Sequence, residues 1–550
     1  MVDAAPPPTP TTQPDHTPSS TRTTALPRAT TALPHVTTAL PHVTTALPRA
    51  TRVLPRPTRA LRRATGALPR GRGRLFGAGA GFAVTWQTSS ATSATQAGGH
   101  RRSPAPSPRG GPVPEPVTAA PGPAAPDSLP HVVVVGAGFA GLAVVKGLAK
   151  APVRVTLVDR RVYNTFQPLL YQVATGGLNP GDVTYFLRGL RLKQKNVRVV
   201  HEHLVGIDHE ARRIRLLNDE WIGYDYLVVA NGVTANFFGT PGAKENSFPM
   251  YSRSQAMKIR DTLFIRLEKA AANPGKDEGL RVVVVGGGAT GVEVAGALAE
   301  LRTAGLRPAY PEIHGDAFEV KIVQRGAEVL KSFHPKLRRY AAEELRRRGV
   351  GLHLGAGVAE VLPDAVVLTD GTRIRSDLTV WSAGVHPHEE VDDWGLPRGD
   401  GGRVVVGDDL QVEGLPGVFA AGDIAVSPAG LPQLAQPAIQ SGEQVARNIE
   451  ALLAGRPTTP LRYFDKGTMA VIGRRAAIAE VVGRLRLTRG VAWLAWLFVH
   501  IMGLIGPRNR LTTLAGLVTR YGFPFHRRPI PIVGDVPTVR PPKRTTPRRG

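Results

Sequence analysis

The first residues that could do chemistry form a glycine-rich loop behind a short apolar run. The run is His131–Val135, and the loop that follows places Gly136, Gly138 and Gly141 in the spacing GxGxxG. The first glycine permits a tight turn, the second lets the backbone approach a pyrophosphate, and the third lets helix and strand pack closely. The pyrophosphate lies at the positive end of the next helix. The pattern predicts a strand, a turn and a helix through Lys150 that together bind a dinucleotide.

An acid at the end of a second apolar run supports this prediction. Val153–Val158 is followed by Asp159, about 20 residues beyond the loop. A carboxylate at this place accepts hydrogen bonds from ribose hydroxyls. The alternative is a glycine-rich loop without a ligand.

The same pattern returns further along the chain. Arg281–Val285 leads into Gly286, Gly288 and Gly291. Two such folds in one chain indicate two dinucleotides, one held permanently and one exchanged.

The second fold lacks the usual acid. Its next strand, Glu319–Val323, ends at Gln324 and is followed by Arg325, although an insertion around 302–317 lengthens the gap from the loop. Glutamine keeps a hydrogen bond but does not repel a 2′-phosphate, and the arginine would attract one. We therefore expect NADPH to be accepted beside NADH. The alternative is that Gln324 binds the NADH ribose and Arg325 faces solvent.

Two further segments belong to this architecture. Short alternating strands are expected from Val197 to Leu217. A buried strand from Gly417 ends in Gly422-Asp423, and in flavoproteins with two nucleotide folds such an end closes the flavin domain, with the Asp on the ribityl chain.

Composition excludes several kinds of chemistry. The chain has no cysteine, which removes disulfides, thiolate metal sites and thiol redox mechanisms, and no metal site is expected. The formal charge of +26 suits nucleic acid or anionic lipid equally. No nucleic-acid motif accompanies it, so we expect no nucleic-acid partner. A solvated basic surface and an anionic lipid surface stay open.

The two ends differ from the middle. Residues 1–128 are rich in Pro, Thr, Ala and Arg, and their seven-residue leucine repeat is interrupted by prolines that break helices. We predict a disordered extension there, and a basic disordered tail at 526–550.

The C-terminal part of the chain is predicted to form two helices. Val491–Gly506 is mostly apolar but shorter than the ~20 residues that cross a bilayer, and Pro507–Arg510 is expected to end it. A second helix would place five apolar residues on one face: Leu511, Leu514, Leu517, Val518 and Tyr521. Such a pair fits a segment that lies in the membrane interface. Core-packing helices or a dimer interface are the alternatives.

From about residue 130 to 522 the chain resembles the type II NADH dehydrogenases, the single-subunit NADH:quinone oxidoreductases of respiratory membranes that do not pump protons. Four segments in the same order carry the resemblance: Phe166–Ala174, Leu434–Gly442, Asp465–Arg474 and Trp493–His500. The resemblance implies non-covalent FAD in the fold at Gly136 and NADH in the fold at Gly286. Hydride would pass to the flavin, and a membrane quinone would be reduced. It also implies a peripheral protein on the cytoplasmic face of the cell membrane and allows a homodimer.

The resemblance also implies roles for single residues. Gln436 and Gln440 match glutamines near the flavin ring and the quinone headgroup; the alternative is that they cap backbone groups. Lys466 matches a lysine beside the same pocket and could instead be a surface lysine. Glu293 matches an acid close to the flavin, although a helix dipole alone favours Glu in a first turn.

Gln167 and Pro168 match the quinone path, with plain packing as the alternative. Three residues depart from the family pattern. Asn231 replaces a usual Thr, Gln324 replaces the acid, and Pro507 replaces an aromatic residue and is expected to kink the segment.

Together these features predict an α/β protein with two Rossmann-like domains. The FAD domain is discontinuous, at 129–250 and 385–485, and encloses the NAD(P)H domain at 251–384. Membrane-association helices occupy 486–525. A ferredoxin-reductase-like flavoprotein with a soluble partner is the second hypothesis, and a slowly reacting redox sensor is the third.

Overall fold

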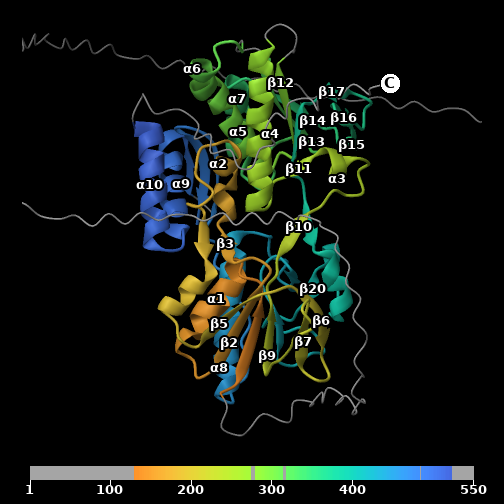
Figure 1. Ribbon diagram of the computed structural model, residues 1–550, viewed down its shortest axis with the longest axis vertical. Helices are drawn as coiled ribbons and strands as arrows, with labels where there is room; N and C mark the ends of the chain where they lie inside the picture. The colour runs from red at the N-terminus through yellow and green to blue at the C-terminus, as the bar shows by residue number, and fades with distance from the viewer. Residues whose placement is uncertain (1–128, 274–278, 314–316, 483–484, 523–550) are drawn as a thin grey trace, which may run out of the picture. The chain divides into compact units, whose positions relative to one another are not determined.

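A computed structural model of the chain describes residues 129–273, 279–313, 317–482 and 485–522 (Figure 1). The predictions for the extension at 1–128 and the tail at 526–550 lie outside these ranges. The described part contains two parallel five-stranded sheets with helices packed against them. The α/β class is therefore confirmed.

The first sheet combines two distant parts of the chain. Its strand order is β21-β9-β1-β2-β5, and all neighbours run parallel. The strands are β1 (His131–Val135), β2 (Arg154–Asp159), β5 (Val197–His201), β9 (Tyr226–Val229) and β21 (Val418–Ala420). Because β21 pairs with β9, the segment that ends in Gly422-Asp423 returns to the sheet that begins with the first glycine loop.

The second sheet repeats this plan. Its order is β11-β18-β12-β13-β14, again parallel. The strands are β11 (Phe248–Pro249), β12 (Leu280–Val285), β13 (Phe318–Gln324), β14 (Val350–Leu354) and β18 (Leu378–Trp381). Both sheets thus place a glycine loop after their central strand, where a dinucleotide fold binds its pyrophosphate.

Each sheet carries a small antiparallel insertion directly after one of its edge strands, β5 in the first sheet and β14 in the second. In the first these are β6 (Leu204–Asp208), β7 (Arg213–Leu216) and β8 (Trp221–Gly223); in the second, β15 (Val358–Val361), β16 (Ala365–Leu368) and β17 (Arg373–Arg375). The short alternating strands expected from Val197 to Leu217 are therefore present. Val197–His201 is a strand of the parallel sheet, and only the segments after it form hairpins.

The remaining elements surround and connect the sheets. The helices are α1 (Phe139–Gly147), α2 (Leu170–Ala174), α3 (Ala243–Asn246), α4 (Arg253–Ala272), α5 (Ala289–Glu300), α6 (Arg307–Ala309), α7 (Pro335–Arg347) and α8 (Ala435–Leu453). Further strands are β3 (Tyr163–Thr165), β4 (Thr184–Phe186), β10 (Val233–Ala235), β19 (Val385–Pro387), β20 (Val404–Val405) and β22 (Ala425–Val426). The 3-10 turns are Leu148–Lys150, Gln167–Leu169, Leu187–Leu192, Glu389–Trp394 and Asp400–Gly402. The antiparallel pair β10–β19 carries the chain out of one sheet region and back.

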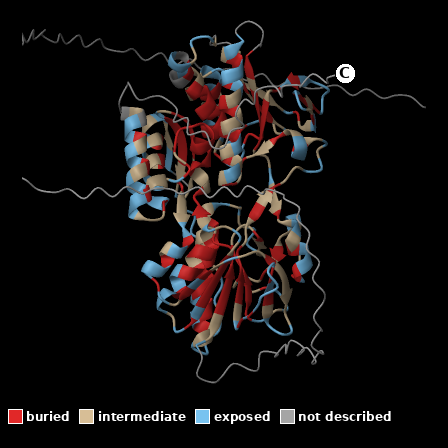
Figure 2. Cartoon of the chain, in the orientation of Figure 1, coloured by how far each residue is buried: buried red, intermediate tan, exposed pale blue. Residues whose placement is uncertain are grey.

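Glycines bring the main helices close to their neighbours. A Cβ on Gly442 of α8 would meet the carbonyl oxygen of Ala140 in α1, so these helices pack backbone to backbone. A Cβ on Gly296 of α5 would meet the carbonyl oxygen of Ile472. Figure 2 shows the buried residues concentrated on both sheets and on the helix faces that cover them.

The C-terminal part forms a small sheet and two helices. The sheet contains β23 (Thr468–Gly473), β24 (Ala476–Val481) and β25 (Leu485–Thr488) and shares a buried core with the second parallel sheet. The helices are α9 (Arg489–Gly503) and α10 (Pro507–Gly522). No helix among the described residues is long and apolar enough to cross a membrane.

One detail of the C-terminal predictions is corrected. Pro507 does not kink or end a helix; it begins α10, where a proline is tolerated because its missing N–H has no partner in a first turn. Among the apolar residues of α10, Leu517 is buried whereas Leu511, Leu514 and Val518 are exposed.

The buried side of α10 is instead partly polar. Asn509 and Thr513 are buried, and the Asn509 amide donates to the carbonyl oxygen of Thr184 (2.6 Å). The exposed apolar side chains of α9 and α10 form one set, which we call the apolar face: Val491, Leu494, Phe498, Val499, Met502, Leu511, Leu514 and Val518.

The close contact of α5 with β23 predicts a sharp cost for added volume. We expect Gly296→Ala to lower the thermal unfolding midpoint, because overpacking of this kind costs about 1–3 kcal/mol. Gly490→Ala in α9 is the control, since a Cβ there has nothing within 4 Å. Equal midpoints of both variants, measured by circular dichroism, would show that the contact tolerates the methyl group.

Candidate active site

The three glycines of the first loop have different surroundings: two are packed tightly against backbone, and one has open space beside it. Gly136 has φ +99°, and a Cβ on Gly136 or Gly141 would overlap backbone atoms. Gly138 differs, because a Cβ there would have only the carbonyl oxygen of Ala230 nearby, at 4.0 Å. The space above Gly138 is therefore available to a ligand.

Asp159, at the end of β2, holds this loop in place. Its carboxylate accepts hydrogen bonds from the amides of Ala137 (2.6 Å) and Arg161 (2.7 Å). Burial raises the pKa of Asp159 in spite of these bonds. The acid thus fixes the loop backbone at the place where the fold would bind a ribose.

The second loop repeats the arrangement with an uncharged residue. Gly286 has φ +107°, a Cβ on Gly291 would meet the Gly286 carbonyl oxygen, and Gly288 has nothing within 4 Å. The Gln324 Oε1 atom accepts a hydrogen bond from the amide of Gly287 (2.8 Å). Gln324 therefore occupies the position that Asp159 has in the first fold, with the exposed Arg325 beside it.

The inserted residues that obscured this match lie elsewhere. Leu301–Leu306 continues α5 as one π-helical turn, and α6 follows it. The insertion thus extends the chain between α5 and β13 without moving the end of the strand.

A cavity lies above the first loop. Its lining includes Gly138, Asp159, Asn231, Tyr251 and His388. Both polar atoms of the Asn231 side chain are buried and have no hydrogen-bond partner within the described residues. A buried amide without partners is costly unless a ligand or water satisfies it. This amide and the space above Gly138 fit a bound dinucleotide.

A second cavity, which we call the central cavity, is lined by both folds. Gly138 and Phe139 come from the first fold, and Ala289, Thr290 and Glu293 from the second. Other parts of the chain complete the lining: Gln167, Pro168, Tyr251, Gly422, Asp423, Gln433, Met469 and His500. The predicted residues Gln167, Pro168, Glu293, Gly422 and Asp423 are therefore brought together here.

Glu293 is the buried acid of the central cavity. Its Oε1 atom accepts a hydrogen bond from the amide of Val471 (3.3 Å). Desolvation raises the pKa of Glu293 to about 8. The carboxyl is therefore mostly protonated at neutral pH and can donate a proton.

Asp423 is a second buried carboxyl of this cavity. Its Oδ2 atom lies 3.5 Å from the hydroxyl of Tyr251, which can donate to it. Burial raises the pKa of Asp423 to about 6. Tyr251 was not predicted as a site residue; it precedes Ser252, the residue that caps α4. The capping pattern was the available signal for this position.

His500 was also missed as a lining residue. Its Nδ1 atom lies 2.7 Å from the carbonyl oxygen of Trp496, and the two rings stack with centroids 4.1 Å apart. Burial lowers the pKa of His500 to about 4, so the ring is neutral. The donor to the carbonyl must then be Nδ1, which leaves Nε2 as an acceptor. A single titratable residue within an apolar run was the signal for it.

The predicted glutamines and lysine are placed differently from one another. The Oε1 atoms of Gln167 and Gln436 are buried without a hydrogen-bond partner within the described residues. Gln440 instead makes two hydrogen bonds with the backbone of Phe464 (both 2.9 Å). Lys466 is exposed, and neither it nor Gln440 lines the central cavity. Their roles toward a substrate stay predictions.

Comparisons with known proteins agree with this geometry. Residues 130–442 match the family model described as pyridine nucleotide-disulphide oxidoreductase. The type II NADH:quinone oxidoreductase Ndh of Mycobacterium tuberculosis is 36% identical over 401 residues, which cover 70% of this chain and 86% of that protein. An internal alternative NAD(P)H-ubiquinone oxidoreductase of Arabidopsis thaliana mitochondria is 29% identical over 72% of this chain and 84% of its own length.

A solved structure shows the same fold. NDH2 from Plasmodium falciparum, in complex with NADH, superimposes with a TM-score of 0.66 at 19% identity, covering 71% of this chain and 98% of that one. Since the family model spans more than half of the chain, and a relative above 30% identity covers more than two thirds of it, the chain belongs to the type II NADH:quinone oxidoreductases of the pyridine nucleotide-disulphide oxidoreductase family.

Proposed function

We propose that this protein oxidises NADH with FAD as its resident cofactor and reduces a membrane quinone without pumping protons. The observation that carries the proposal is the central cavity, where loops of both nucleotide folds line one space. A dinucleotide on each loop would direct its reactive end toward this space. Because NADH and quinone would meet the same flavin, the chain needs no metal and no thiol for the reaction.

The residues present fit this cofactor assignment. The loop of Gly136, Gly138 and Gly141 would bind the FAD pyrophosphate, and Asp159 its ribose. Asp423 and the unpartnered amide of Asn231 would bind the remainder of the molecule. The second loop, at Gly286, Gly288 and Gly291, would bind NADH, with Gln324 at the ribose. When bound, the flavin supplies the redox chemistry that no side chain here can provide.

The side chains supply binding, orientation and protons. Glu293 holds a proton on its buried carboxyl and would give it to a quinone oxygen as negative charge develops there. The neutral His500 offers Nε2 as a hydrogen-bond acceptor for a hydroxyl group of the product. Gln167 lines the same cavity, and its amide oxygen, which has no partner among the described residues, would accept a hydrogen bond from a hydroxyl group of the quinol. The amide nitrogen of Gln436, whose oxygen is also without a partner among the described residues, would donate to a quinone carbonyl.

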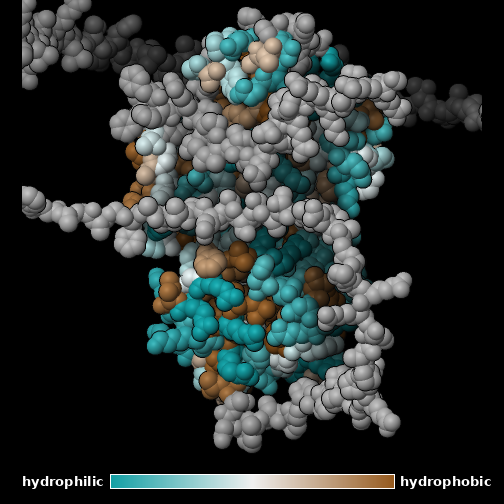
Figure 3. All heavy atoms as spheres, in the orientation of Figure 1, coloured by the Kyte–Doolittle hydropathy of each residue, from teal (hydrophilic) through white to brown (hydrophobic). Residues whose placement is uncertain are grey.

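The exposed apolar face favours a quinone over a soluble ferredoxin-like partner. Phe498 and Leu494 are 68% and 60% exposed, and His500 of the same helix lines the central cavity. Apolar side chains reach the surface over α9 and α10 (Figure 3). One helix thus connects an apolar surface to the reaction space, as a bilayer-dissolved substrate requires. We propose peripheral attachment through this face; its cytoplasmic side, and a homodimer, stay predictions.

The two open glycines allow each nucleotide site to be blocked without a clash in the fold. We expect Gly138→Val to purify largely without flavin colour, because its side chain would fill the pyrophosphate space. Gly288→Val should purify yellow but show a raised KM for NADH. Absorbance at 450 nm and steady-state kinetics measure both effects. Flavin retained by Gly138→Val and lost by Gly288→Val would reverse the assignment of the two folds.

Protonated Glu293 predicts a pH dependence of quinone reduction. The rate with a quinone should fall as the pH rises through about 8, because the carboxyl loses its proton. Glu293→Gln should lower that rate by about 100-fold or more and remove the fall. Ferricyanide reduction, which takes up no proton, is the control and should change little. An unchanged quinone rate would exclude Glu293 as the proton donor.

The pH dependence of the folding stability independently tests the raised pKa of Glu293. The folded pKa lies above the ordinary 4.5, so the stabilising contribution is complete below pH 4.5 and is lost as the pH rises toward 8. The melting temperature of Glu293→Gln relative to wild type should therefore increase between these pH values.

Gln324 and Arg325 predict a relaxed choice of nicotinamide. We expect wild type to discriminate against NADPH by less than about 100-fold in kcat/KM, equivalent to ~2.7 kcal/mol. Gln324→Glu should restore a strong NADH preference, because a carboxylate repels the 2′-phosphate. Arg325→Gln is the companion variant and should weaken NADPH use alone. Strict NADH preference in wild type would contradict the idea.

The apolar face predicts which side chains bind the bilayer. Removal of α9 would also remove Trp496 and His500, so point variants are the cleaner test. We expect Leu494→Gln/Phe498→Gln to lower cosedimentation with neutral phosphatidylcholine vesicles at least about tenfold, since burial of each side chain contributes ~1.5–3 kcal/mol. Leu217→Gln/Phe238→Gln changes equally exposed residues elsewhere and should bind like wild type. Equal loss in both pairs would contradict a specific face.

A further inference from the structure

A third cavity lies apart from both nucleotide sites and shares no lining residue with them. It measures about 470 Å³, within the range of small-molecule sites. Helix α7, the turn between β23 and β24, and the start of α9 form its walls. Its lining is strongly basic: Tyr340, Glu343, Glu344, Arg347, Arg348, Arg474, Arg475 and Arg489. We call it the arginine cavity.

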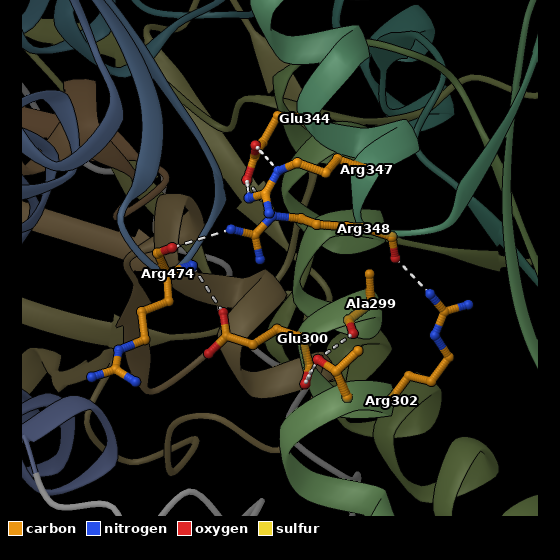
Figure 4. A network of polar contacts seen from close by, with 8 residues as sticks. Ala299, Glu300, Arg302, Glu344, Arg347, Arg348 and Arg474 are labelled. Carbon is orange, nitrogen blue, oxygen red and sulfur yellow. Dashed lines mark hydrogen bonds and ion pairs between the residues drawn. The ribbon is translucent and has the colours of Figure 1, made fainter. Parts of the chain in front are cut away.

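Two of the arginines are held by one buried acid. The Glu344 Oε1 atom accepts hydrogen bonds from Nη2 of Arg347 (2.6 Å) and Nε of Arg348 (2.8 Å). Arg348 also donates to the carbonyl oxygen of Arg474 (3.1 Å), as Figure 4 shows. The wall of the cavity is therefore fixed, and the charge of Glu344 is shared by two guanidinium groups.

Arg474 connects this wall to two other helices. Its amide donates to Glu300 of α5 (3.0 Å), and its guanidinium donates to the carbonyl oxygen of Tyr521 in α10 (2.5 Å). In Figure 4 dashed lines join the Arg474 backbone to both Arg348 and Glu300. The cavity is thus built between the second nucleotide fold and the C-terminal helices.

The remaining arginines face the cavity without an acid of their own. The side chains of Arg475 and Arg489 are exposed and form no ion pair or hydrogen bond among the described residues, while the Arg489 backbone is hydrogen-bonded to the Tyr340 side chain. Both have left-handed backbones, with φ +57° and +60°, a conformation that residues other than glycine rarely adopt. Five arginines and two glutamates line this one space, so the lining carries an excess of positive charge that an anion would compensate.

The cavity adjoins the apolar face, and this position favours a lipid headgroup as the source of the anion. Arg489 is the first residue of α9, and the exposed Val491 and Leu494 of the apolar face follow it directly. Val482 and Leu485, 60% and 57% exposed, come shortly before it in the chain. Apolar side chains that enter a bilayer bring neighbouring residues to the level of the lipid headgroups. Arginine forks match the oxygens of a phosphate.

We infer that the arginine cavity binds the phosphate of an anionic phospholipid headgroup. The inference rests on the proposed membrane attachment and adds lipid selectivity to it: the apolar face binds any bilayer, and the cavity selects an anionic lipid. Because Arg474 contacts both α5 and α10, a bound headgroup would also hold the C-terminal helices against the nucleotide fold.

Vesicle binding by the full-length holoenzyme tests this inference. The test variant is Arg475→Asn/Arg489→Asn, because asparagine tolerates a left-handed backbone. The matched control is Arg339→Gln/Arg346→Gln, which removes the same charge from exposed residues of α7 that do not line the cavity. Affinities are measured for vesicles of phosphatidylcholine alone and with phosphatidylglycerol. Melting temperature and ferricyanide reduction check that each variant is intact.

We expect wild type to bind phosphatidylglycerol vesicles at least tenfold more tightly than neutral ones. The test variant should lose most of this gain, and the control variant less than threefold. If both variants lose the same part of the affinity gain from phosphatidylglycerol, general surface charge attracts the vesicles, and the inference of a headgroup site in the cavity is wrong. Equal binding of wild type to both vesicle types would also overturn it while leaving the membrane proposal intact, whereas no binding to either would refute the membrane proposal itself. If inorganic phosphate stabilises wild type but does not compete with vesicle binding, the cavity binds a free anion, and the inference of a lipid headgroup is wrong.

Discussion

The contact between α5 and β23 is the constraint on which the rest of the site depends. At Gly296 the helix lies directly against the carbonyl oxygen of Ile472, with no room for a side chain between them. This contact ties the helix that begins at the second glycine loop to the C-terminal sheet. It therefore fixes Glu293, one turn earlier on α5, beneath the space that the first loop also lines. Two folds that could each bind a nucleotide alone thereby share one reaction space.

Burial then gives the polar groups of this space their properties. Desolvation raises the pKa of Glu293 to about 8, although hydrogen bonds from the Val471 amide and the Trp496 side chain oppose this shift. His500 is half-buried, stacks on Trp496 and is kept neutral by desolvation of its ring, which lowers its pKa to about 4. An acid that keeps its proton and an imidazole that stays uncharged are suited to a substrate that takes up protons as it is reduced. Neither property belongs to the residue types alone.

The two sides of helix α9 have different surroundings. One side of α9 closes the central cavity through His500 and packs Trp496 into the core, while the other side exposes the apolar face. The arginine cavity begins where α9 begins, so charge and apolar surface adjoin. This arrangement explains why the helices are short for crossing a bilayer and yet rich in apolar residues: they would rest on its surface while contributing to the enzyme interior.

The sequence by itself determined the two nucleotide folds, because glycines at GxGxxG spacing after β-branched runs have few other physical solutions. The absence of cysteine likewise excluded thiol chemistry, and the position of Gln324 at the end of its strand was predicted despite the insertion before it. Only the tertiary structure decided what depends on neighbours distant in the chain: the partnerless amide of Asn231 and amide oxygen of Gln436, the hydrogen bonds of Gln440 to the Phe464 backbone, and the lining roles of Tyr251 and His500. It also showed that Pro507 begins a helix and that α10 buries Asn509 and Thr513 rather than all of its leucines. The reason is physical: a local pattern sets backbone conformation, whereas burial and pKa depend on which segments pack together.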